Sequence, residues 1–99
     1  MASIKVEKSL VSLGKVLRDA RRRRLMSQKD LADRVGITRQ TIKRIEDGCS
    51  GVALEKYLTL FLIFNKLDDF NALFNSDEIG RIILENTILP TRIRSKRTS

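Results

Sequence analysis

Residues 38–46 read TRQTIKRIE, and four of their side chains carry groups that can bind the edges of nucleic-acid bases. These four are Arg39, Gln40, Lys43 and Arg44. If the segment is helical, all four lie opposite Ile42 and Ile45. An arginine can bind guanine O6 and N7 bidentately, and a glutamine can bind adenine N6 and N7. The spacing predicts a helix that reads bases in the major groove, and a merely solvated helix face is the alternative.

Three further polar residues are candidates for contacts with DNA phosphates: Gln28, Thr38 and Thr41. Each is expected near the start of a helix, where free N–H groups favour anions. The amide of Gln28 could instead brace Arg39. For Thr38, capping the helix explains the residue equally well.

The chain has no histidine and one cysteine, which excludes most catalytic and metal-binding chemistry. A zinc site, a histidine general base and a Ser–His or Cys–His pair all need residues that are missing here. We therefore expect no catalytic residue, no metal, no cofactor and no enzyme activity. Cys49 alone cannot form an intrachain disulfide, so nothing indicates an oxidising compartment.

No segment of the sequence has the character of a membrane anchor or a signal peptide. The longest apolar run, Tyr57–Phe64, contains a threonine and is far shorter than the roughly 20 residues a membrane span needs. The first ten residues, MASIKVEKSL, lack a sustained apolar region. We expect a cytoplasmic protein without a membrane partner.

Charge is unevenly distributed along the 99 residues, whose formal net charge is +8. Residues 15–48 hold eleven Lys or Arg against five Asp or Glu, and residues 90–99 hold four basic groups and no acid. Residues 49–89 hold three basic and six acidic groups. A basic cluster of this kind indicates a polyanion partner, although a solvated surface is the alternative. RNA binding is disfavoured because an aromatic stacking platform is missing.

Helical periodicity and capping residues predict an all-α chain. Apolar residues recur at helical spacing between Leu10 and Arg24. Ser27, with Asp30 three residues later, predicts the start of a second helix, and Gly36 a left-handed stop. Thr38 then caps the next helix. Two short helices joined by a tight glycine turn predict a helix-turn-helix.

The later segments are expected to complete a small helical domain. A fourth helix is predicted over Leu54–Phe64, and apolar residues from Leu67 to Phe74 suggest a fifth. Residues 76–89 could be a helix or a strand. The expected organisation is an arm, a helix-turn-helix domain, a C-terminal extension and a disordered basic tail, at residues 1–9, 10–75, 76–89 and 90–99.

The stretch from Ser27 to Gly48, SQKDLADRVGITRQTIKRIEDG, resembles the Cro and lambda-repressor type helix-turn-helix proteins. The matching positions are Gln28, Ala32, Gly36, Ile42 and Ile45. The resemblance implies a five-helix lambda-repressor-like fold and a dimer that binds a double-stranded DNA operator, acting as a repressor. It also implies base contacts mainly from Arg39, Gln40 and Lys43, and a salt bridge between Arg21 and Glu46.

One position departs from that family, which usually has glycine with positive φ where this chain has Leu25. Positive φ is unfavourable for leucine, so the first helix is expected to end differently or to run one residue further.

The segment after Cys49, with SDEIG and LPTRIR, resembles the HipB-like branch, whose members often accompany HipA-like kinase toxins. An antitoxin that binds such a kinase is therefore the alternative function.

Overall fold

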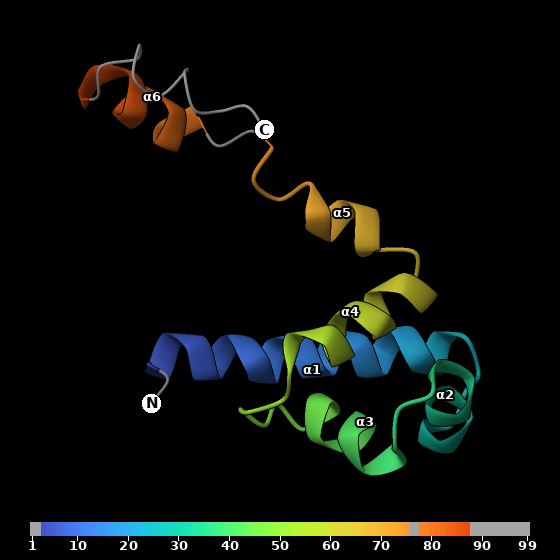
Figure 1. Ribbon diagram of the computed structural model, residues 1–99. Coiled ribbons are helices and arrows are strands. Elements are labelled where there is room, and N and C mark those ends of the chain that lie inside the picture. The colour runs from blue at the N-terminus through green and yellow to red at the C-terminus, as the bar shows by residue number, and fades with distance from the viewer. Residues whose placement is uncertain (1–2, 76–77, 88–99) are drawn as a thin grey trace. The chain divides into compact units, whose positions relative to one another are not determined.

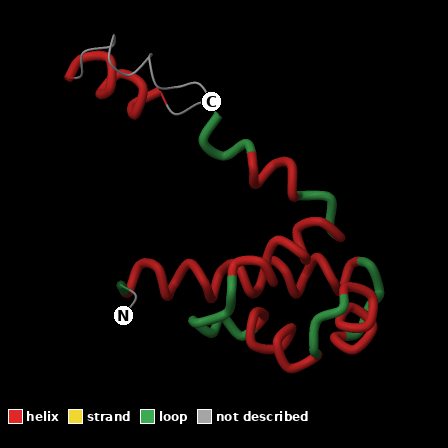
Figure 2. Tube along the Cα trace, in the orientation of Figure 1, coloured by secondary structure: helices red, strands yellow, loops and turns green. Residues whose placement is uncertain are grey.

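The computed structural model describes residues 3–75 and 78–87, and every regular element in these ranges is a helix (Figure 2). The helices are α1 (Ile4–Arg23), α2 (Gln28–Val35), α3 (Arg39–Glu46), α4 (Leu54–Ile63), α5 (Leu67–Asn71) and α6 (Glu78–Thr87). The all-α, lambda-repressor-like fold expected from the sequence is confirmed. The chain divides into two units, Met1–Leu67 and Asp68–Ser99. None of the described helices has the length and apolar character needed to cross a membrane.

The first unit is built around α1, with α2 and α3 on one side of it (Figure 1). Helix α3 packs against both α1 and α2, and α2 also packs against α4. Their buried side chains form one core, to which each helix contributes: Leu17, Leu31, Ala32, Ile37, Ile42, Ile45, Tyr57, Leu60 and Phe64. Because α3 packs against two helices, its apolar face is buried and its opposite face is exposed.

Helix α1 begins six residues before the predicted Leu10, so most of the segment predicted to be an N-terminal arm is helical. The side chain of Ser3 accepts a hydrogen bond from the backbone N–H of Val6 at 3.2 Å and caps the helix. Ile4 and Val6 are exposed in this first turn. These residues therefore extend the first helix toward the N-terminus, with a face that stays exposed.

The connection from α1 to α2 corrects the expectation for Leu25. Helix α1 ends at Arg23, and Leu25 adopts a left-handed conformation with φ of 56°. Its N–H donates to the carbonyl of Arg22 at 2.9 Å, and its side chain is 92% exposed. The turn therefore keeps the geometry that a glycine would adopt, at a conformational cost to leucine.

The second unit contains most of α5 and all of α6. The segment whose sequence left helix and strand open is a helix from Glu78 to Thr87. Exposed apolar side chains in this unit are Leu73, Phe74, Ile79, Ile82, Ile83 and Leu84. The predicted basic tail, residues 90–99, lies outside the described residues.

Candidate nucleic-acid interface

The start of α2 is fixed by reciprocal hydrogen bonds between Ser27 and Asp30. The Ser27 hydroxyl accepts from the Asp30 N–H at 2.9 Å, and the Asp30 carboxylate accepts from the Ser27 N–H at 3.0 Å. The two bonds form a capping box. They also lower the pKa of the Asp30 carboxyl. The predicted N-cap of α2 is confirmed.

The turn between α2 and α3 uses the predicted glycine. Gly36 has φ of 72°, and its N–H donates to the carbonyl of Ala32 at 2.9 Å. Thr38 begins α3 by accepting a hydrogen bond from the Thr41 N–H at 3.1 Å. Side chains with Cβ are strained at positive φ, so the glycine fits this helix end.

Helix α3 is seated on its neighbours by two isoleucines and by a glycine of α1. Ile42 and Ile45 are fully buried. Gly14 allows α1 to approach the end of α3, because a Cβ there would lie 2.6 Å from the carbonyl oxygens of Ile45 and Glu46. The sequence analysis missed Gly14, although an isolated glycine inside a helical pattern often marks close packing.

The four predicted base-reading residues all lie exposed on α3. The side chains of Arg39 and Gln40, in its first turn, make no hydrogen bond to the described residues. Lys43 and Arg44, one turn later, are engaged within the molecule. The Lys43 ammonium donates to the Asp47 carboxylate at 2.7 Å, and Arg44 donates to the backbone carbonyl of Ser50 at 2.9 Å.

The predicted phosphate-contacting residues are placed differently from one another. Thr38 is exposed at the N-terminus of α3, and its hydroxyl donates to the Thr41 hydroxyl at 2.9 Å. Gln28 is half-buried, and its amide donates to Glu46 at 3.0 Å. The amide therefore turns toward the carboxylate of Glu46 at the other end of α3, and the expectations that it contacts a phosphate or braces Arg39 stay predictions.

Glu46 is buried at the end of α3 and accepts hydrogen bonds from two other helices. Arg21 of α1 donates from Nε at 2.7 Å and from a terminal nitrogen at 2.9 Å, which makes the ion pair that the resemblance implied. Burial raises the pKa of Glu46, but the bonds from Arg21 and Gln28, with the charge of Arg18, outweigh it and hold the pKa below 4.5. Both side chains are buried, so the ion pair lies inside the protein and not on the exposed face of α3.

Two charged residues near the end of α3 were absent from the sequence interpretation. Arg18 of α1 reaches the backbone carbonyl of Glu46 at 3.4 Å and lies 3.9 Å from the Asp47 carboxylate. Asp47 also accepts the bond from Lys43, which lowers the pKa of Asp47 and raises that of Lys43. Both residues are charged and at the molecular surface, so their types alone gave no signal.

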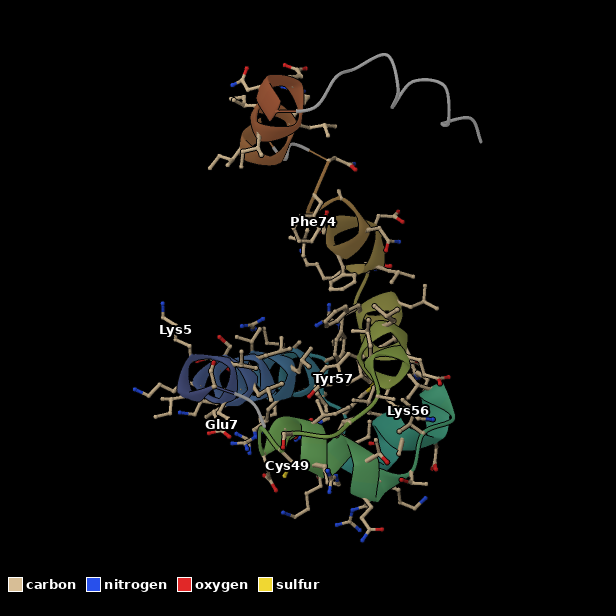
Figure 3. All side chains as sticks on the ribbon, turned by 60° about the vertical axis from the view of Figure 1, so that its left-hand side comes forward. Lys5, Glu7, Cys49, Lys56, Tyr57 and Phe74 are labelled. Atoms are coloured by element: carbon tan, nitrogen blue, oxygen red, sulfur yellow. The ribbon has the colours of Figure 1, made fainter. Side chains whose placement is uncertain are left out.

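The loop after α3 carries the one cysteine. The Cys49 N–H donates to the carbonyl of Arg44 at 3.0 Å, which closes the end of the helix, and Figure 3 shows this loop beside α3. In residues 3–75 and 78–87, no group of three or more Cys, Asp or Glu side chains is arranged to hold a metal ion.

These features agree with the comparison with known families. We found no match to this chain among curated proteins or among solved structures. The comparison with family models does not reach a HipB-like branch, so a HipA-like kinase partner stays a prediction. Residues 17–58, which run from the core of α1 into α4, match the family described as Helix-turn-helix, a DNA-binding regulatory domain.

Proposed function

We propose that this protein is a sequence-specific regulator of transcription that inserts α3 into the major groove of double-stranded DNA. The observation that carries the proposal is the exposed row of donors on a helix whose other faces are buried. Because Ile42 and Ile45 fix the rotation of α3, its polar side chains are held in one orientation. The match of residues 17–58 to a DNA-binding family supports the same function.

Arg39 and Gln40 are the proposed principal base readers. They occupy the first turn of α3, and their side chains are not engaged with the described residues. In helix-turn-helix complexes, the first residues of the second helix meet the base edges. Lys43 and Arg44 follow one turn later and are proposed to extend the row of contacts.

Backbone contacts are proposed for residues at the helix starts. Thr38 and Thr41 lie where the free N–H groups and the dipole of α3 favour a phosphate. Gln28 uses one amide N–H on Glu46, which leaves its second amide N–H for a phosphate. The basic residues between positions 15 and 48 would steer the protein toward DNA.

Alanine substitutions separate base reading from general charge attraction. The probe is a duplex selected from a random library by the full chain, compared with a scrambled duplex of equal composition across a salt series. Arg39→Ala and Gln40→Ala should each cost about 1–3 kcal/mol on the selected duplex and much less on the scrambled one.

Arg22→Ala is the matched control, because Arg22 is exposed on α1 and carries the same charge as Arg39. It should weaken both duplexes alike and flatten the salt dependence. Equal losses on both duplexes for Arg39→Ala and Gln40→Ala would rule out the assignment of α3 as the reading helix.

Dimerisation and autorepression extend the proposal. Leu62 on α4 is 61% exposed and Val16 on α1 is 60% exposed, so apolar surface is left for another protein chain. A symmetric pair of reading helices would meet two half-sites on the DNA. The DNA upstream of the protein's own gene is the first operator to test by electrophoretic mobility shift.

A further inference from the structure

The position and order of the ion pair between Lys43 and Asp47 do not favour the stability of α3. The Asp47 carboxylate lies at the C-terminal end of the helix, where the helix dipole disfavours a negative charge. The lysine precedes the acid by four residues, the less favourable order for such a pair on a helix. The side chains of Lys43 and Asp47 are 64% and 42% exposed, so their attraction is screened by water.

The carboxylate of Asp47 is nevertheless held in place from two helices. Lys43 of α3 approaches it at 2.7 Å, and Arg18 of α1 lies 3.9 Å away. The carboxylate therefore draws the Lys43 ammonium toward the end of α3 opposite Arg39 and Gln40. An ammonium has three N–H donors, so Lys43 keeps two for another acceptor while it stays bonded to Asp47.

We infer that Asp47 is a positioning residue that raises the sequence specificity of DNA binding by holding Lys43. This inference rests on the proposed function of α3. In the complex with the preferred site, Lys43 donates to base acceptors such as guanine O6 and N7 from its place beside Asp47. On other DNA, Lys43 gives its full charge to a phosphate only when it leaves Asp47, because the carboxylate already balances the ammonium. The carboxylate thus penalises binding that depends on phosphates alone.

The chain contains a matched control for this arrangement on α2. Lys29 and Asp33 form the same exposed pair, in the same order and four residues apart, at 3.0 Å. Asp33→Asn removes the same charge as Asp47→Asn and likewise releases a lysine, although Asp47 also has Arg18 beside it. The Asp33→Asn substitution lies on α2 and not on α3, so it measures the general effect of charge on DNA binding.

The test compares both variants on the selected and scrambled duplexes across a salt series, after thermal melting has shown that each variant folds. Relative to Asp33→Asn, Asp47→Asn should raise affinity for the scrambled duplex by about threefold to fivefold, the scale of an exposed ion pair. The salt dependence on that duplex should steepen by about 0.9 in the slope of log affinity against log salt, because one more phosphate is neutralised. Affinity for the selected duplex should rise no more than in Asp33→Asn, so the ratio of the two affinities falls.

A double-variant experiment shows whether Asp47 acts through Lys43. In a Lys43→Ala background, Asp47→Asn should leave the ratio unchanged. An unchanged ratio for Asp47→Asn alone, or an equal fall with Asp33→Asn or in the Lys43→Ala background, would overturn the inference. The proposed function fails by a different result, namely a wild-type chain that binds the selected and scrambled duplexes equally.

Discussion

At the scale of single residues, Glu46 joins three helices through one carboxylate. It belongs to α3, and it accepts hydrogen bonds from Arg21 of α1 and Gln28 of α2. Its side chain is buried, so loss of its charge would leave the Arg21 guanidinium without a counter-ion in the interior. The orientation of α3, the proposed reading helix, therefore depends on the charge of this carboxylate.

The pH dependence of stability follows from the lowered pKa of Glu46. In the unfolded chain this carboxyl titrates near 4.5, and above that pH it is ionised in both states, so its full stabilising effect is present. As the pH falls from 4.5 through the lower pKa of the folded state, the unfolded chain binds the proton first and the stabilisation is lost. We expect the free energy of unfolding, measured in urea, to decrease across this range.

Glu46→Gln isolates this effect from the other carboxyls. The variant should lose about 3 kcal/mol at neutral pH, the scale for removing one partner of a buried pair. The difference between wild type and variant should shrink as the pH falls below 4.5. A difference independent of pH, or an NMR titration of Glu46 at or above its ordinary pKa, would contradict this account.

At the scale of elements, the turn after α1 stores conformational strain in Leu25. A left-handed conformation costs an L-residue roughly 1–2 kcal/mol relative to its preferred regions. Leu25 makes no compensating burial, because its side chain is 92% exposed. Leu25→Gly should therefore raise the free energy of unfolding by about 1 kcal/mol, after the greater chain entropy of unfolded glycine is subtracted.

Leu25→Ala is the control for this prediction. Alanine keeps the strain of a Cβ at positive φ and removes only the exposed part of the side chain. Chemical denaturation should show little change for alanine and a higher midpoint for glycine. Equal effects of the two substitutions would mean that the left-handed conformation is not what limits the stability of this turn.

The helix-turn-helix could be predicted because its signals are local in the sequence. Ser27 and Asp30 cap α2, Gly36 ends it, and Thr38 caps α3, and each of these acts within four residues along the chain. The exposure of Arg39 on the outer face followed from the helical period alone. These parts of the candidate site needed no knowledge of the tertiary structure.

The parts of the candidate site that could not be predicted depend on contacts between segments far apart in the sequence. Gly14 is needed because α1 meets the backbone of Glu46, and the amide of Gln28 is directed by the same residue, 18 positions away. The roles of Arg18 and Asp47 likewise appear only when α1 and α3 lie side by side. A one-dimensional pattern records residue types and spacing, but it does not record which distant backbone or charge they meet.

At the scale of the whole molecule, a single helix-turn-helix reads only a short stretch of DNA. The exposed row on α3 spans two turns of helix, so one chain can contact few base pairs. Two chains related by a two-fold axis would double the site, and exposed apolar side chains such as Leu62 leave surface for that association. The dimer proposal therefore predicts a particular geometry in the DNA as well as in the protein.

The selected duplex should contain two inverted half-sites whose centres lie about 10 base pairs, or one DNA turn, apart. Insertion of about 5 base pairs between them would turn the second half-site to the opposite side of the duplex. We then expect affinity to fall to that of a duplex with a single half-site. Sedimentation should show two chains on the original duplex. A single unpaired half-site in the selected DNA, or an affinity insensitive to the insertion, would contradict the proposed dimer while leaving α3 as the reading helix.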